Sequence, residues 1–111
     1  LPAILTAFLT RGYAVTDFVN FTTANPARLF GLYPRKGAIA IGSDADVAIV
    51  DDSGTWTIDP STFRSKARYS PYAGHEVKAH VDLTMVRGKV VYEAGEIVGV
   101  AGDGRLQIPG G

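Results

Sequence analysis

The sequence predicts an α+β fold in which short helices come first and a mostly β module follows. Up to Gly31, apolar residues recur at helical spacing, and glycines stand where helices would end. After Pro34, short apolar runs alternate with turns rich in Gly, Asp and Ser, which is typical of strands. We therefore expect a helical segment over residues 1–33 and a β module with an extended tail over residues 34–111.

The first expected helix has one apolar face. Ile4, Leu5, Phe8 and Leu9 fall on that face at the 3.6-residue period, and Gly12 is placed to end the helix.

Two more short helices are expected before the β module. Asp17 can begin the second, which carries Phe18. The third has a strong start signal, because Asn25 suits the N-cap and Pro26 suits the first helical position. Gly31 can take the left-handed conformation that closes it.

The β module begins with two apolar runs. Residues 37–42 are expected to form a short strand, followed by a polar turn at 43–45. Residues 47–50 are apolar on both faces, which predicts a strand in the interior of a sheet. Residues 51–54 have the composition of a turn, and residues 55–58 alternate as a further strand.

Residues 59–75 have no clean period and are expected to form an ordered loop. The loop interleaves cations with aromatic rings, as proteins that bind single-stranded nucleic acid do. With zero net charge and one such cluster, we expect ion pairs and tyrosine packing instead, and no nucleic-acid partner. The side chains concerned are Arg64, Lys66, Arg68, Tyr69 and Tyr72.

The remaining strands are expected between residues 76 and 98. Two of them lie within 76–92 and are joined by a tight turn at 87–88. A second turn at 94–95 then leads into a third short strand at 97–98. The tail is expected to be extended and docked by Leu106 and Ile108.

Composition excludes several classes of partner. Eleven basic residues balance eleven acidic ones, so no long-range field recruits nucleic acid or an anionic membrane. No apolar stretch approaches the roughly 20 residues that a membrane span requires. The absence of cysteine fits a reducing cytoplasm, which is the expected location. Because the chain opens on Leu1-Pro2 inside an apolar helix pattern, we expect it to be cut from something longer.

The two histidines are the first candidates for metal chemistry. His75 and His80 flank Glu76 as in a zinc-protease motif, but that motif needs histidines four apart on a helix. Here they are five apart in a segment that alternates as a strand, where odd spacing sends side chains to opposite faces. We interpret both as surface or structural residues.

Residues 37–44 have glycines spaced as in a phosphate-binding loop. Ser43 and Asp44 stand where that loop has Lys and Ser or Thr. Without the Lys nothing holds the phosphates, and a carboxylate would repel them. A phosphate site is therefore not expected.

Four carboxylates in this region could bind calcium or magnesium, namely Asp44, Asp46, Asp51 and Asp52. No EF-hand loop follows, and the polar ends of a strand are a simpler interpretation. A paired-acid hydrolytic site stays open, since the sequence neither marks nor excludes a pair. There is no Gly-x-Ser-x-Gly elbow for a serine nucleophile. We assign no catalytic, cofactor-binding or metal-binding residue.

Five segments together resemble the C-terminal part of the cyclic amidohydrolases. The tail is most similar to the hydantoinase and dihydropyrimidinase branch, while the loop would also suit allantoinase or dihydroorotase relatives. The segments are residues 25–37, 42–51, 65–74, 86–96 and 102–106.

The resemblance implies a parent enzyme that hydrolyses the C–N bond of cyclic amides or ureides of the hydantoin or dihydropyrimidine type. In that family a (β/α)₈ barrel holds two divalent metals, usually zinc, which a carboxylated lysine bridges, and a metal-bound hydroxide attacks the ring. The resemblance also implies that residues 1–33 are the last turn of the barrel. Residues 34–111 would then belong to a composite β-sandwich built from both ends of the parent chain.

None of the family's metal ligands maps onto this sequence, so the resemblance implies a scaffold segment that is itself inactive and binds no cofactor. Its expected partners are the rest of the barrel and further copies in a homo-oligomer. We expect an incomplete sandwich with unpaired edges, and a first helix packed against another copy. The alternative is a free-standing β-rich binding domain without enzymatic activity.

Overall fold

The computed structural model describes residues 1–110 and confirms the α+β class. In it, three α-helices precede the strands, which form a four-stranded antiparallel sheet in the order β1-β4-β5-β6 and a separate β2-β3 pair. The helices are α1 (Pro2–Thr10), α2 (Val15–Thr22) and α3 (Ala24–Leu29). The strands are β1 (Val47–Asp51), β2 (Trp56–Thr57), β3 (Glu76–Val77), β4 (His80–Val86), β5 (Lys89–Glu93) and β6 (Glu96–Ile97).

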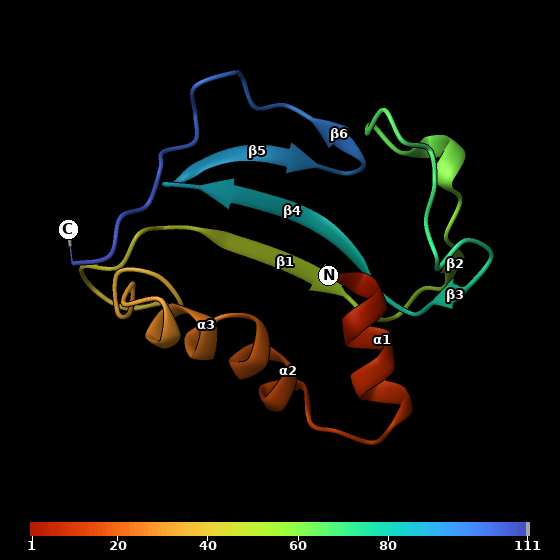
Figure 1. The fold of residues 1–111 in the computed structure, drawn as a ribbon, viewed down its shortest axis with the longest axis horizontal. Coiled ribbons are helices and arrows are strands. Elements are labelled where there is room, and N and C mark those ends of the chain that lie inside the picture. Colours follow the sequence, from red (N-terminus) through yellow and green to blue (C-terminus); the bar gives the residue numbers. More distant parts are fainter. Residues whose placement is uncertain (111) are drawn as a thin grey trace.

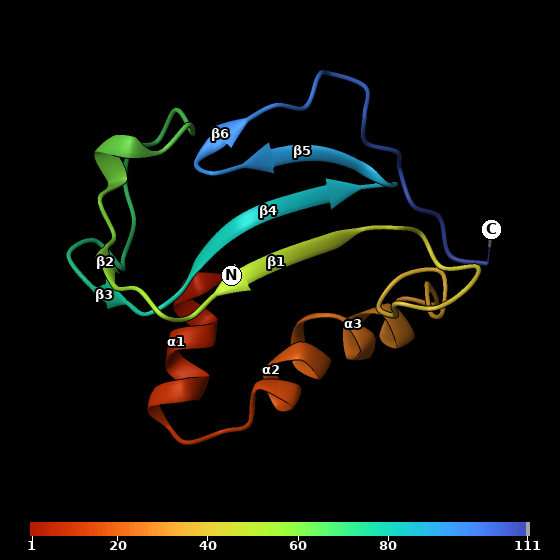
Figure 2. The same ribbon diagram turned by 180° about the vertical axis from the view of Figure 1, so that it is seen from behind.

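The helices lie along the β1 side of the larger sheet, and the β2-β3 pair stands apart at one end of it (Figure 1). Seen from behind, the C-terminal tail returns to the segment that links α3 to β1 (Figure 2). None of the helices described is both long and apolar enough to cross a membrane.

The apolar face of the first helix is confirmed. Leu5 is 4% exposed and forms a small core with Phe18 of α2 and Ala79. The ring of Phe8 contacts Phe18 at a centroid distance of 5.8 Å and Phe21 at 5.5 Å. Part of this face is therefore covered by the chain itself, while Ile4 remains 43% exposed.

The third helix begins earlier than expected. The expectation that Asn25 is the N-cap is wrong. Thr23 is the N-cap of α3 and also the C-cap of α2, so the two helices share one capping residue. The backbone N–H of Thr23 donates to Val19, and its carbonyl accepts the first α3 bond from Ala27. Pro26 then falls in the first turn, where its missing N–H costs nothing. The closing role of Gly31 is confirmed by its φ of +66°.

Residues 37–42 do not form the expected strand. Gly37 and Gly42 have φ of +79° and +91°, so the backbone turns at both ends of the run. The segment closes on itself through a bond from the Asp44 N–H to the Arg35 carbonyl. Its apolar side chains are left in solvent, with Ile39 91% and Ile41 108% exposed.

The prediction of an interior strand over residues 47–50 is also wrong. β1 lies at the edge of the sheet, with Ile49 52% exposed, and the interior strands are β4 and β5. The apolar side chains on both faces of β1 are therefore not fully buried by the residues described.

The two tight turns that follow are confirmed. Arg87 and Gly88 between β4 and β5, and Ala94 and Gly95 between β5 and β6, all have positive φ. Two consecutive positive φ values are what a two-residue hairpin loop requires, because the twist of such a turn matches that of the strands.

The long loop over residues 59–75 is confirmed and contains a short 3₁₀ turn, Pro60–Thr62. The expected tyrosine packing is found in part, because the ring of Tyr72 contacts that of His75 at a centroid distance of 6.2 Å, whereas Tyr69 is 77% exposed. The expected ion pairs are absent among the residues described, and Arg68 donates to the Ser61 carbonyl at 3.3 Å instead.

The tail is extended but is not docked by its apolar residues, since Leu106 is 89% and Ile108 63% exposed. Polar contacts hold it instead. Lys89 Nζ lies 2.8 Å from Asp103 Oδ1, and Arg35 Nη2 donates to the Ile108 carbonyl at 2.9 Å.

The surface is large for the mass. The chain exposes 7865 Å², about 2,000 Å² more than a compact monomer of 11.8 kDa is expected to expose. Its radius of gyration is 15.2 Å, against about 13 Å for a compact domain of this length. The fold thus leaves uncovered more surface than one side of a standard protein interface, which is about 800 Å².

Candidate functional site

Three turns that are distant in sequence meet at one end of the larger sheet. They are residues 34–37, 42–46 and 87–88, and we call this meeting place the turn junction. Lys36 Nζ lies 2.7 Å from Asp44 Oδ2 and also binds the carboxylate of Asp46. Asp46 Oδ1 in turn accepts the backbone N–H of Arg87 at 2.8 Å. The carboxylate of Asp46 thereby joins the turn at residues 34–37 to the β4-β5 hairpin.

The electrostatics of the turn junction favour its charged state. Burial acts to lower the pKa of Lys36, but hydrogen bonds and attraction to Asp44 and Asp46 outweigh it and raise this pKa. Burial acts to raise the pKa of Asp46, but the bonds from Lys36 and the Arg87 backbone lower it overall. Lys36 therefore stays cationic and Asp46 anionic across the neutral range.

The turn junction uses its polar groups internally. The Ser43 hydroxyl donates to the Pro34 carbonyl at 2.7 Å, and the Gly88 N–H donates to the Ala45 carbonyl at 2.9 Å. The ammonium group of Lys36 is held by two carboxylates, so it is not free to bind a phosphate. The arrangement is therefore a structural clamp.

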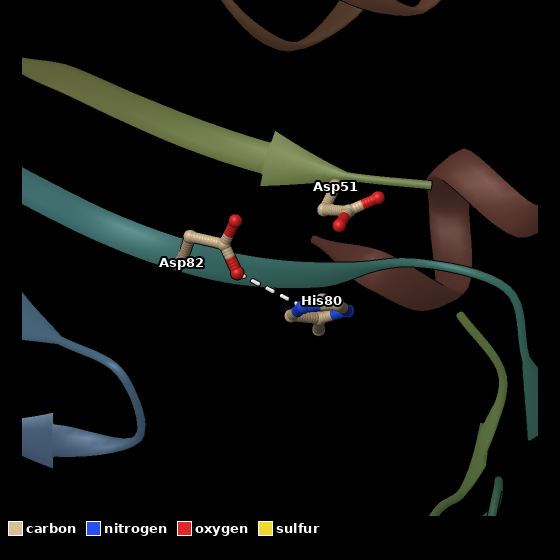
Figure 3. A group of neighbouring side chains, drawn as sticks. All are labelled: Asp51, His80 and Asp82. Carbon is tan, nitrogen blue, oxygen red and sulfur yellow. Dashed lines mark ion pairs between the residues drawn. The ribbon is translucent and has the colours of Figure 1, made fainter. Parts of the chain in front are cut away.

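A second cluster lies at the other end of β1, where Asp51, His80 and Asp82 converge (Figure 3). Each residue offers one ligand atom, and these atoms all lie within 4.8 Å of one another. His80 Nε2 is 2.9 Å from Asp82 Oδ1. The Asp51 carboxylate also accepts hydrogen bonds from Ser53, and these lower its pKa.

The other candidates from the sequence lie outside this cluster. His75 packs its ring against Tyr72 at 6.2 Å, and its carbonyl accepts the Ile58 N–H. Glu76 and its neighbour are a strand, so the helical zinc-protease motif is excluded. Asp52 is not among the three converging residues.

The sequence did not predict the Asp51–His80–Asp82 cluster, because the pairing of β1 with β4 is not a local property. One signal was present: a His-x-Asp pair on a strand has both side chains on one face. What was missing was the register that sets Asp51 opposite His80.

An open groove of about 830 Å³ runs along the sheet beside this cluster. Most of its lining is apolar, and His80 is one of the few polar side chains that reach it. Its walls include Trp56, His80, Val86, Val91, Tyr92 and Val100.

The binuclear metal centre of the amidohydrolase resemblance does not fit these residues. That centre requires a bridging lysine and several histidines. The whole chain has two histidines, and the convergent group contains one of them and no lysine.

Comparison with known proteins gives a consistent match. Residues 4–91 match the model of the Amidohydrolase family. The chain is 42% identical to an L-hydantoinase of Paenarthrobacter aurescens over 107 residues, which are 96% of this chain and 23% of that protein. It is 36% identical to a D-hydantoinase of Rhizobium radiobacter over 94 residues, 85% of this chain and 21% of that one.

Solved structures agree. A dihydropyrimidinase from Brevibacillus agri superposes with a TM-score of 0.88 at 34% identity, over 94% of this chain and 23% of that one. An L-hydantoinase from Arthrobacter aurescens superposes with a TM-score of 0.83 at 43% identity, over 88% of this chain and 22% of that one. The chain spans about a fifth of the length of the relatives it matches.

Proposed function

This chain belongs to the amidohydrolase family, and from that premise we propose that it is the C-terminal scaffold portion of a metal-dependent hydrolase of cyclic amides. The parent enzyme would open hydantoin or dihydropyrimidine rings, as the names of the relatives suggest. Residues 1–110 would position the rest of the enzyme and do no chemistry themselves.

The observation that carries this proposal is the uncovered apolar surface. Ile39 and Ile41 are almost fully exposed on a loop that the turn junction holds in place. Fully burying such a side chain stabilises a protein by roughly 1.5–3 kcal/mol. A chain that leaves about 2,000 Å² of extra surface in water is suited to packing against further polypeptide.

We place that further polypeptide on two sides. The edge strand β1 and the groove beside β4 are suited to the missing strands of a composite sandwich, and the helices to the remainder of a barrel. Further copies in a homo-oligomer would cover what is left. Two divalent metals, zinc in most members, would be held by residues outside this chain.

The test compares the 111-residue chain with the product of the whole reading frame that contains it. Ring opening of a 5-substituted hydantoin and of a 5,6-dihydropyrimidine is followed for both proteins. We expect the longer protein to be active, to lose activity with a chelator and to recover it with Zn²⁺. The short chain is expected to be inactive.

Two outcomes would contradict the proposal. Ring opening by the purified short chain would make it an enzyme in its own right. A reading frame that encodes no barrel would favour a free-standing β-rich binding domain.

A further inference from the structure

We propose that Asp51, His80 and Asp82 form a binding site for a divalent first-row transition-metal ion, which would tie the edge strand β1 to β4. The three side chains point toward one another from two neighbouring strands (Figure 3).

The spacing of the ligand atoms suits one ion. With metal–ligand bonds of about 2.0–2.2 Å, neighbouring ligand atoms stand roughly 3 Å apart and opposite ones about 4 Å apart. The separation of His80 Nε2 from Asp82 Oδ1 is 2.9 Å, and all three atoms lie within 4.8 Å of one another. Small side-chain rotations are enough to complete the coordination.

The register of the sheet brings Asp51 to this face. β1 and β4 pair in one register up to Ile49, which is opposite Leu83. The next residue, Val50, is opposite Val81, so Asp82 is an extra residue that forms a bulge in β4. Asp51 is consequently opposite His80 instead of Val81. Residues directly opposite in an antiparallel pair share a face, and a bulge is a common way to re-aim a side chain. Without the bulge, Asp51 would be opposite Val81, and the side chains of Asp51 and His80 would lie on opposite faces of the sheet.

The backbone under the cluster is anchored. Ala79, which precedes His80, is 0% exposed and belongs to the core. Its carbonyl accepts the indole N–H of Trp56 at 2.8 Å. Asp51 is fixed by the bond from the Ser53 N–H at 2.7 Å. Because the backbone that carries the ligands is already fixed, binding an ion would cost little conformational entropy.

The donor set indicates the class of ion. Imidazole suits zinc, copper, nickel and iron, whereas carboxylates and water alone suit magnesium and calcium. One imidazole with two carboxylates gives a mixed set that also neutralises a divalent charge. His80 and Asp82 have side chains 46% and 48% exposed, so solvent can fill the remaining coordination positions.

The test titrates the chelator-treated chain with Zn²⁺ alone, followed by calorimetry and by the nuclear magnetic resonance signals of the two histidine rings. We expect one Zn²⁺ per chain and a shift of the His80 ring signals with little change at His75. Mg²⁺ at the same concentration should produce no shift. Co²⁺ should give visible absorption bands when it takes the same site.

Matched variants assign the ligands. His80→Asn should abolish binding, and Asp51→Asn and Asp82→Asn should each weaken it at least about tenfold. His75→Asn and Asp52→Asn are the controls. The first removes an imidazole from the loop before β3, and the second removes a carboxylate from the residue that follows Asp51. Both controls should bind Zn²⁺ within about twofold of the unaltered chain.

Two results would overturn the site. One is a folded chain whose His80 signals do not move at about 1 mM Zn²⁺. The other is an equal loss of binding in His75→Asn and His80→Asn, which would mark adventitious binding to exposed imidazoles. A rise in the unfolding temperature with Zn²⁺ that His80→Asn removes is a second readout, independent of the spectra.

Discussion

The turn junction and the Asp51–His80–Asp82 cluster have the same plan, two carboxylates around one basic nitrogen, but opposite degrees of closure. In the turn junction Lys36 is 16% exposed and the backbone N–H of Arg87 adds a further bond to Asp46. In the cluster His80 is 46% exposed, and imidazole carries a charge only when protonated. The first is completed from within the chain, whereas the second has room for an outside cation.

The largest expected effect comes from the close packing under the turn junction. Gly37→Ala would place a methyl group 2.7 Å from Ala27 Cβ and 2.8 Å from the Thr23 carbonyl, at a φ of +79°. Strain and overpacking together should lower the free energy of unfolding by about 3 kcal/mol or more. Urea unfolding followed by circular dichroism measures the loss.

Gly42→Ala is the matched control for that experiment. Its φ is +91°, but nothing lies within 4 Å of the added methyl group. Only the backbone cost of about 1–2 kcal/mol should appear. Equal losses in the two variants would mean that helix α3 does not pack against the turn junction.

The next effect sharpens the comparison between the two clusters directly. Lys36→Met leaves Asp44 and Asp46 without their shared cation and should cost about 1–2 kcal/mol, between the values for exposed and buried pairs. His80→Asn, in the exposed cluster, should cost less than about 0.5 kcal/mol in metal-free buffer. A larger loss of unfolding free energy in His80→Asn than in Lys36→Met would contradict the difference drawn between the two clusters.

A smaller effect is expected from pH. Asp46 has a pKa below the ordinary 3.8, so its contribution to stability is present above pH 3.8 and is lost as pH falls through the lower folded value. Lys36 has a pKa above 10.5, so its contribution is present below pH 10.5 and is lost above the raised folded value. Urea unfolding at a series of pH values should show both losses.

Asp46→Asn is the variant that assigns the acid part of this profile. It should lower stability at neutral pH by about 1 kcal/mol and flatten the decline below about pH 4. An unchanged acid profile in this variant would show that Asp46 is not the group responsible.

Local signals in the sequence were sufficient for the helices, the hairpin turns and the long loop. Gly12 and Gly31 follow helices, and the positive φ values at Arg87 and Gly88 lie where the tight turn was expected. Two turns of the turn junction, at 43–45 and 87–88, were predicted separately, but their meeting was not, since the contact between Asp46 and Arg87 joins residues about forty positions apart.

The errors share a physical cause. An apolar run such as residues 37–42 or 47–50 indicates burial without saying which surface provides it. In residues 1–110 the first run is an exposed loop and the second is an edge strand, so their burial would need polypeptide from elsewhere. The cluster around His80 was missed for a different reason, a one-residue register shift that has no local signature.

Sedimentation velocity of the isolated 111-residue chain over a range of concentrations tests the scaffold role most directly. With about 2,000 Å² of surplus surface and apolar side chains such as Ile39 and Ile41 in solvent, the chain should associate as concentration rises and should bind a hydrophobic dye. A monomer at every concentration that binds no dye would contradict the account.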